Sequence, residues 1–152
     1  GELVGYGATS DGYDMVAPSG EGAYRCMKMA LSTVKEKVDY INPHATSTPA
    51  GDVAEYKALR SVFGDGLRSV PISATKSMIG HLLGGAGAAE AAACVCSLRD
   101  QRLHPSINVD ELDPVFELDL VREARACDLR YVLKTSAGFG GHNCALVFER
   151  AG

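Results

Sequence analysis

The stretch from residue 76 to 98 constrains the fold of this chain more than any other. It opens on Lys76, continues to His81, and then becomes a run of glycine and alanine in which Glu90 is the only charged residue. A run this apolar on nearly every side predicts a helix over residues 80–99, buried between other elements. Glycines lower the stability of such a helix, which indicates that neighbouring backbone approaches it closely.

Two other interpretations of this stretch are disfavoured. A membrane span would be rich in leucine and isoleucine, whereas alanine and glycine dominate here and Glu90 lies inside the run. A nucleotide-binding module is suggested by the glycines at 84, 85 and 87, but they follow a histidine and do not form G-x-G-x-x-G. Lys76 and His81 at the entrance of a buried helix instead predict the floor of an active site.

Composition limits the classes of protein. The chain has 152 residues, 46% of them hydrophobic, which is enough for one globular domain with a core. A net charge of −4 gives no electrostatic reason to expect nucleic acid as a partner. The five cysteines are odd in number and mostly lie in apolar segments; Cys94 and Cys96 share a helix and make no zinc site. We expect free thiols, no metal, and a reducing compartment: the cytoplasm first, with plastid and mitochondrial interiors left open.

The remaining elements alternate along the chain. Strands are predicted at 2–8, 38–42, 70–72, 129–135 and 144–148, one helix begins after Ser19 with an apolar stripe through Val34, and another begins at Pro49. This order predicts a layered α/β domain with a five-stranded, mostly parallel mixed sheet, helices on both faces and a terminal hairpin. The connection 102–120 is longer than most, which suggests a functional or partner-contacting role.

Two histidines and a lysine are candidate catalytic residues. His44 follows the second strand and His81 opens the third helix, so both can converge at one end of a parallel sheet. Two neutral imidazoles that donate to one carbonyl would stabilise an enolate; the alternative for each is a bond to backbone at an element end. A buried Lys76 needs a partner, and Asp52 or Glu55, on the inward face of the second helix, could supply it.

Four segments together resemble a known family. They are Val4–Asp11, His44–Pro49, Lys76–His81 and Gly138–Asn143, in that order and spacing. The chain resembles, over its whole length, the C-terminal half of a β-ketoacyl-acyl carrier protein synthase, a condensing enzyme of the thiolase fold. The likeness is closest to the type I enzymes of fatty acid synthesis. Residues 1–152 are therefore expected to form the C-terminal thiolase-like domain of such an enzyme.

The resemblance implies a role for each matching residue. In that family the equivalents of His44 and His81 bind the malonyl carbonyl and promote decarboxylation, while Lys76 joins a network with nearby acidic residues. Thr46 and Thr48 match hydroxyls that bond the amides of phosphopantetheine, which arrives on the acyl carrier protein; no cofactor of the chain's own is implied. Thr48 could equally just cap its helix.

The glycine-rich segment near the C-terminus completes the implied site. Gly138 and Gly140 permit a strained turn with exposed N–H groups around Phe139. The resemblance implies that the backbone N–H of Phe139 helps form an oxyanion hole, while its ring gates the acyl pocket. Ala137 stands where the family more often has phenylalanine, which leaves the acyl-chain preference open.

The family's nucleophile has no counterpart here. Its cysteine lies in the N-terminal half of the enzyme, and none of the five cysteines has that context. We therefore expect this chain to be inactive alone and to pack residues 80–98 against that missing half or a second chain. We expect the full enzyme to be a homodimer with acyl carrier protein as partner. A non-catalytic chain-length subunit or a polyketide-type ketosynthase partner is the alternative.

Glu90 among alanines must be neutral, paired or bound to a cation. Several members of the family bind a monovalent cation with the equivalents of Asn42 and Glu90. Strand alternation places Lys134 on the face of the strand opposite to that of Leu133. The family rarely has a lysine at this position. We hypothesise that the Lys134 ammonium replaces the cation and pairs with Glu90; the alternative is that Lys134 points to solvent.

Overall fold

The computed structural model describes residues 1–152 and is built on one mixed sheet of six strands. In sheet order these are β1 (Glu2–Ser10), β8 (His142–Glu149), β7 (Tyr131–Gly138), β2 (Tyr40–Asn42), β3 (Pro71–Ile72) and β5 (Asp119–Leu120). The first three are antiparallel neighbours, and β7, β2, β3 and β5 are parallel. The predicted mixed sheet and terminal hairpin are confirmed. The prediction of five strands missed β5, a two-residue strand in the long connection.

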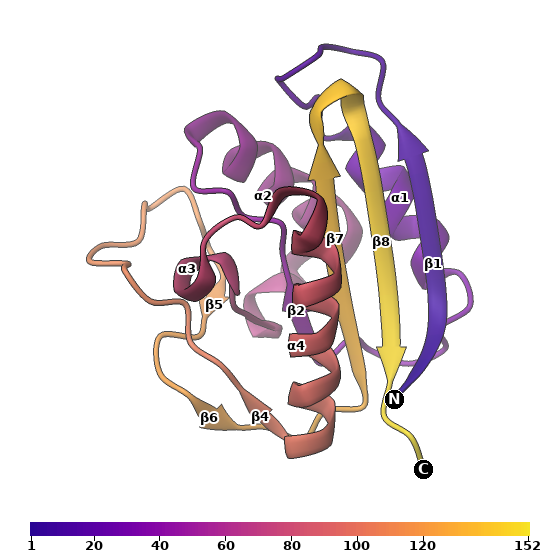
Figure 1. Cartoon of the computed structure of the whole chain (residues 1–152), viewed down its shortest axis with the longest axis vertical. Helices are drawn as coiled ribbons and strands as arrows, with labels where there is room; N and C mark the ends of the chain where they lie inside the picture. Colours follow the sequence, from indigo (N-terminus) through magenta and orange to yellow (C-terminus); the bar gives the residue numbers. More distant parts are fainter.

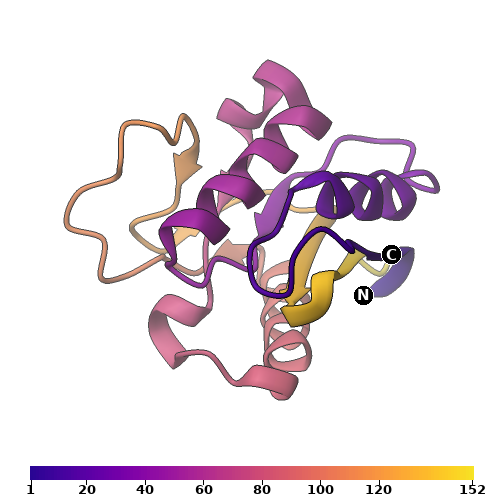
Figure 2. The same ribbon diagram turned by 90° about the horizontal axis from the view of Figure 1, so that it is seen from above.

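Helices cover both faces of this sheet, as predicted. Helices α1 (Glu21–Leu31) and α2 (Pro49–Phe63) lie on one face, and α4 (Ala86–Asp100) lies on the other (Figures 1 and 2). Strand alternation divides the core accordingly, because Leu133 packs with the α1 and α2 side chains and Val132 packs with those of α4.

Short elements make the connections. The 3₁₀ helix η1 (Gly64–Ser69) follows α2, and β4 (Arg102–Leu103) pairs with β6 (Arg125–Ala126) in a separate two-stranded ribbon. The stripe of the first helix predicted an element through Val34, but α1 ends at Leu31. Helix α2 begins as predicted, with Thr48 at its N-cap, although the Thr48 side chain makes no capping hydrogen bond.

Glycines bring β1 and α1 into direct backbone contact. A Cβ atom on Gly5 would lie 2.1 Å from the carbonyl oxygen of Ala30, and one on Gly7 would lie 2.1 Å from that of Cys26. Neither position has room for a side chain, so these two glycines set the distance between the strand and the helix.

The predicted single helix over residues 80–99 is wrong in its first part. A four-residue helix, α3 (Lys76–Ile79), is followed by an irregular segment and by the 3₁₀ turn η2 (Leu83–Gly85) before α4 begins. Gly80 at φ 76° and Leu83 at φ 50° adopt left-handed backbone that no α-helix contains. The expected close backbone approach is also absent at Gly84, where an added Cβ atom would have no other atom within 4 Å.

Helix α4 is buried on one side only. Glu90, Cys94 and Leu98 are buried, while Val95 is 36% exposed and Leu83, just before the helix, is 77% exposed. The prediction of burial on nearly every side therefore fails within this chain. None of its helices is long and apolar enough to cross a membrane.

Candidate active site

The structure brings the two predicted histidines together. Their ring centroids lie 5.5 Å apart with the ring planes at 85°, although 37 residues separate His44 from His81. His44 lies just beyond the end of β2, and His81 lies in the irregular segment after α3 rather than at the start of a helix. Both therefore reach the carboxyl end of the parallel strands, where ligands of such sheets usually bind.

The loop that carries His44 is strained and held by a carboxylate. Ala45 at φ 37° and Ser47 at φ 63° adopt left-handed backbone, which is unfavourable for residues with side chains. Glu55 of α2 accepts hydrogen bonds from the backbone N–H groups of His44 at 2.8 Å and Ala45 at 2.9 Å. These charge-assisted bonds stabilise the unusual loop and fix the position of the imidazole.

Lys76 is buried, as expected, but its predicted partners are wrong. Its ammonium forms an ion pair with Glu90 rather than with Asp52 or Glu55. It also donates to the backbone carbonyl oxygen of His44 at 2.5 Å. The reason is geometric: Glu55 is already committed to the loop after β2, while Glu90, on the first turns of α4, faces the start of α3.

The predicted pair of Lys134 and Glu90 is formed. The Nζ atom of Lys134 lies 2.6 Å from Oε2 of Glu90, and both side chains are 1% exposed. Burial raises the pKa of Glu90, but the ammonium groups of Lys134 and Lys76 outweigh it and leave the pKa below its usual value. Burial lowers the pKa of Lys76, and its bond to Glu90 partly opposes that shift.

These contacts also decide whether the residues present fit a monovalent cation. Both carboxylate oxygens of Glu90 are engaged by ammonium groups. The Lys134 ammonium additionally donates to the carbonyl oxygen of Thr135. Because positive charge already occupies this pocket, the residues do not fit a second cation there, and no catalytic step is assigned to one.

The two imidazoles differ in their surroundings. Burial and, to a smaller extent, the nearby Lys76 ammonium lower the pKa of His44 to about 4, so the ring is neutral at physiological pH. His81 is exposed, and its Nδ1 accepts the Leu83 N–H at 3.0 Å. That contact assigns the proton of a neutral His81 to Nε2, which is free to donate to a ligand.

The predicted substrate-binding threonines lie in the loop between His44 and α2. The hydroxyls of Thr46 and Thr48 are 3.3 Å apart, and Thr48 is exposed. Asp52, in the first turn of α2, bonds to this loop rather than to Lys76, because its carboxylate accepts the Ser47 N–H at 3.1 Å. Burial and the neighbouring Glu55 raise the pKa of Asp52.

The glycine-rich turn forms as predicted between β7 and β8. It is a short 3₁₀ turn, η3 (Phe139–Gly141), and the Phe139 side chain is 77% exposed. Gly140 and Gly141 have φ values of 77° and 78°, which favour glycine. The turn is anchored to the loop after β1, because Gly140 donates its N–H to Met15 at 2.8 Å and Asp11 donates to Gly141 at 2.7 Å.

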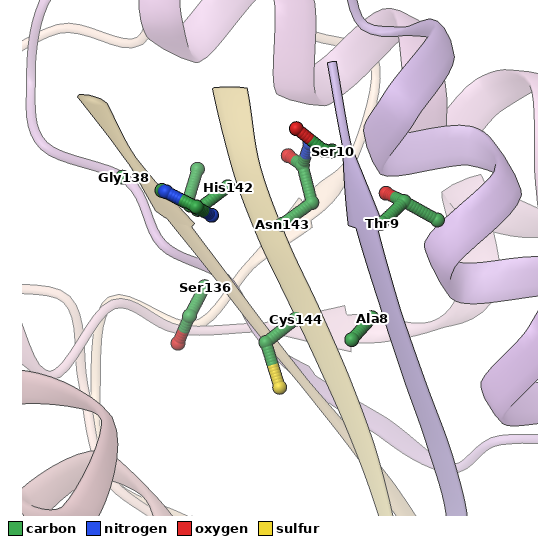
Figure 3. Close-up of a pocket in the computed structure, with 9 residues that line it drawn as sticks. Ala8, Thr9, Ser10, Ser136, Gly138, His142, Asn143 and Cys144 are labelled. Atoms are coloured by element: carbon green, nitrogen blue, oxygen red, sulfur yellow. The ribbon is translucent and has the colours of Figure 1, made fainter. Parts of the chain in front are cut away.

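An open hollow of about 570 Å³ lies beside this turn (Figure 3). Three neighbouring strands supply Ala8, Cys144 and Ser136, which are paired side by side across the sheet. Gly138 and Ala137 also line it. The small side chains leave space on the α4 side of the sheet.

Four of the five cysteines lack the character of a nucleophile. Burial raises the pKa of Cys26 to about 11 and that of Cys94 to about 12, and it also raises the pKa values of Cys127 and Cys144. Thiols are unreactive when their pKa is raised in this way.

Sequence reasoning missed Thr135 as a part of the site. Its hydroxyl donates to Oε1 of Glu55 at 2.7 Å and so completes the support of the His44 loop. Alternation along β7 could have found it, because the residue shares the face of Leu133, which packs with α2.

Comparisons with known proteins agree with this geometry. Residues 1–110 match the family described as β-ketoacyl synthase, C-terminal domain. The chain is 54% identical to 3-oxoacyl-[acyl-carrier-protein] synthase 1 of Haemophilus influenzae, covering 98% of this chain and 37% of that protein. It is 43% identical to 3-oxoacyl-[acyl-carrier-protein] synthase 2 of Staphylococcus aureus, again covering 37% of the relative. The chain therefore spans little more than a third of the curated relatives it matches.

Solved structures show the same fold. A β-ketoacyl synthase from Burkholderia phymatum superimposes with a TM-score of 0.92 at 41% identity, covering 99% of this chain and 37% of that one. The ishigamide ketosynthase/chain length factor gives 0.93 at 35% identity, covering 99% and 38%. The paired histidines, the buried lysines and the glycine turn thus lie in a thiolase-like ketosynthase fold, and the chain belongs to the family of β-ketoacyl synthase C-terminal domains.

Proposed function

We propose that this chain is the C-terminal half of a β-ketoacyl-acyl carrier protein synthase that elongates fatty acids. The complete enzyme would join a malonyl thioester to an acyl group held on a cysteine, with loss of carbon dioxide. The observation that carries the proposal is the pairing of His44 and His81, whose rings lie 5.5 Å apart above a buried lysine network.

The two imidazoles suit the decarboxylation step. When the malonyl carboxylate leaves as carbon dioxide, its bonding electrons move into an enolate, and negative charge grows on the thioester oxygen. The neutral ring of His44 and Nε2 of His81 can each donate a hydrogen bond to that oxygen. Lys76 supports this arrangement through its bond to the carbonyl oxygen of His44.

The glycine turn suits the condensation step. The enolate carbon attacks the acyl thioester, a carbon–carbon bond forms, and the tetrahedral intermediate then expels the cysteine sulfur as thiolate. The backbone N–H of Phe139, on a turn bounded by Gly138 and Gly140, would donate to that intermediate's oxygen. The nucleophilic cysteine would come from the N-terminal half, since the buried thiols of this chain are unsuited to the role.

Partners follow from the same reaction. The substrates would be acyl and malonyl groups on the phosphopantetheine arm of acyl carrier protein, with Thr46 and Thr48 bonding its amides; the chain would need no cofactor of its own. One structural relative is a ketosynthase in complex with its type II polyketide acyl carrier protein. We further expect a homodimer of complete subunits in the cytoplasm.

A chain-length subunit or a polyketide ketosynthase is the second candidate. Similarity to a ketosynthase/chain length factor pair is the observation in its favour. The presence of His44, Lys76 and His81 in one connected site argues against a non-catalytic subunit.

The half-reactions of the complete synthase test the proposal. Loss of one donor at a developing charge typically costs about 10²–10³ in rate. His44→Ala and His81→Ala should each cause a loss of that size in malonyl decarboxylation, while acylation of the cysteine should suffer less. Equal losses in both half-reactions would contradict the assigned roles.

A further inference from the structure

A second polar cluster lies beneath the site, and no role in the proposed reaction has been assigned to it. It consists of buried groups of β2 and the segment before α3, together with His104 of the long connection: Tyr40, Asn42, Ser73, Thr75 and His104. The first four are at most 5% exposed. Buried polar groups in such a number require a defined set of partners.

The hydrogen bonds of His104 define which ring nitrogen carries the proton. Its Nδ1 lies 3.1 Å from the carbonyl oxygen of Pro105, which can only accept, so the ring proton sits on Nδ1. Nε2 of the neutral ring is therefore an acceptor, and burial lowers the pKa of His104, which favours that neutral form. The Oγ1 atom of Thr75 lies 3.1 Å from Nε2 and the hydroxyl of Tyr40 also lies 3.1 Å from it.

The chain of donors continues to β2. The side-chain amide of Asn42 donates to Thr75 Oγ1 at 2.8 Å, so the Thr75 hydroxyl is left to donate to His104. Tyr40 has a second partner in the Ser73 hydroxyl, 2.7 Å away. Nε2 of His104 is thus the terminal acceptor of a chain that joins the end of β2 to the start of α3.

Both joined segments lead directly into the candidate active site. Asn42 is two residues before His44, and Thr75 immediately precedes Lys76. The Lys76 ammonium meets the carbonyl oxygen of His44 at 2.5 Å, so the relative position of the two segments sets that contact. His104 contacts both segments, so a small displacement of one against the other would change its hydrogen bonds.

We propose that His104 is a positioning residue. By accepting a hydrogen bond from the Thr75 hydroxyl, it holds α3 against the end of β2 and keeps the Lys76 ammonium bonded to the carbonyl oxygen of His44. The proposal rests on the proposed function, because its effect is read in malonyl decarboxylation. It assigns no contact between His104 and the substrate.

Other contacts of the same connection support the segment from its outer side. Ser106 accepts the Ala74 N–H at 2.8 Å, and the Asn108 side chain donates to the Ser77 carbonyl oxygen at 3.0 Å. These bonds hold the backbone of α3 in place but do not reach β2. They allow variants at His104 to keep the fold while the hydroxyls of Thr75 and Tyr40 lose their shared acceptor.

The test compares His104→Leu with His104→Gln in the complete synthase. Leucine leaves the Thr75 hydroxyl without its acceptor, and we expect the single-turnover decarboxylation rate to fall about tenfold. Glutamine places an oxygen near the position of Nε2 and should recover most of the rate. Acylation of the cysteine should be unchanged in both. Should the leucine variant fail to fold, His104→Asn, whose short side chain cannot reach Thr75, takes its place.

A second background separates positioning from general stability. In Lys76→Met, where the ammonium is gone, His104→Leu should produce no further loss of rate. Tyr131→Phe is the control, since it removes a part-buried hydrogen bond of 2.9 Å to Glu149 at the opposite end of β7 and should leave the rate unchanged.

Two outcomes would overturn the role of His104: a leucine variant as active as the unmodified synthase, or equal losses with and without Lys76. An unmodified synthase that does not decarboxylate malonyl thioesters would instead overturn the proposed function.

Discussion

The two halves of the histidine pair are held to very different degrees. His44 lies at the start of a strained loop that Glu55 holds through two backbone N–H groups, and its carbonyl oxygen accepts a hydrogen bond from the Lys76 ammonium. His81 lies on an exposed segment between α3 and η2, where its own ring accepts one local N–H from Leu83. Within this chain, one imidazole is fixed by buried charge, and the other depends on the backbone conformation of a short connection.

The largest effect should come from the buried charges beneath His44. Glu90→Gln leaves the ammonium groups of Lys76 and Lys134 without their carboxylate, which typically costs about 3–5 kcal/mol of unfolding free energy. Urea denaturation of the complete synthase measures it. Glu36→Gln is the matched control, because its ion pair with Arg130 is half exposed and contributes little. Equal midpoints for both variants would refute the structural role of Glu90.

Next in size is the clamp on the His44 loop. Glu55→Gln removes the charge from bonds to His44, Ala45 and Thr135 and places a donor where acceptors are needed. Charged hydrogen bonds contribute about 1.5–3 kcal/mol, so decarboxylation should slow about ten- to a hundredfold. Asp52→Asn, which keeps an oxygen to accept the exposed bond from the Ser47 N–H and loses only the charge, should have a clearly smaller effect. The reverse order would mean that Glu55 does not hold the loop.

A smaller effect is expected on the His81 side. Gly80→Ala adds a methyl group in open space, but at φ 76° the substitution costs about 1–2 kcal/mol. We expect a modest loss of decarboxylation activity with little change in the thermal midpoint, as the segment shifts to relieve the strain. Gly84→Ala, also in open space and without a positive φ, should be neutral. Identical behaviour of the two alanines would mean that backbone conformation does not place His81.

The smallest effect should be the change that the loss of the Lys76 charge causes in the pKa of His44. The pKa of His44 is about 4 when folded and near 6.5 when unfolded, so the unfolded chain binds the proton first. His44 therefore contributes stability that is full above about pH 6.5 and is lost as the pH falls towards 4. Lys76→Met removes one of the causes and should raise the folded pKa of His44, as measured by an NMR titration of its ring protons. An unchanged titration would show that burial alone sets the pKa.

How far the sequence predicts this molecule differs between its parts. Hydrophobic periodicity and turn residues located α1, α2 and five of the strands, namely β1, β2, β3, β7 and β8, because each of these elements has a local apolar pattern bounded by turn residues. The two-residue strands β4, β5 and β6 are too short to show such a pattern. The irregular segment around Gly80 was not predicted, because a run of alanine and glycine carries no periodicity that marks where a helix begins. The partner of Lys76 was also missed. Glu55 was a candidate, but it already accepts hydrogen bonds from the backbone N–H groups of His44 and Ala45, and no sequence pattern reveals such bonds.

The pairing of Lys134 with Glu90 could be predicted because it needs only two facts. Alternation along β7 placed the lysine on the α4 face, and a carboxylate among alanines demanded positive charge. The role of His104 could not be anticipated in the same way, since its hydrogen bonds join three segments that are distant in the sequence.

The contact between β1 and α1 has a consequence for mutational scans. Because Gly5 and Gly7 leave no space beneath Ala30 and Cys26, a side chain at either position would force the strand away from the helix. The same strand leads to Asp11, whose backbone N–H donates to the carbonyl oxygen of Gly141 in the turn that carries Phe139. A scan scored by enzyme activity should therefore detect Gly5 and Gly7 as sensitive positions, although neither lines the hollow beside that turn.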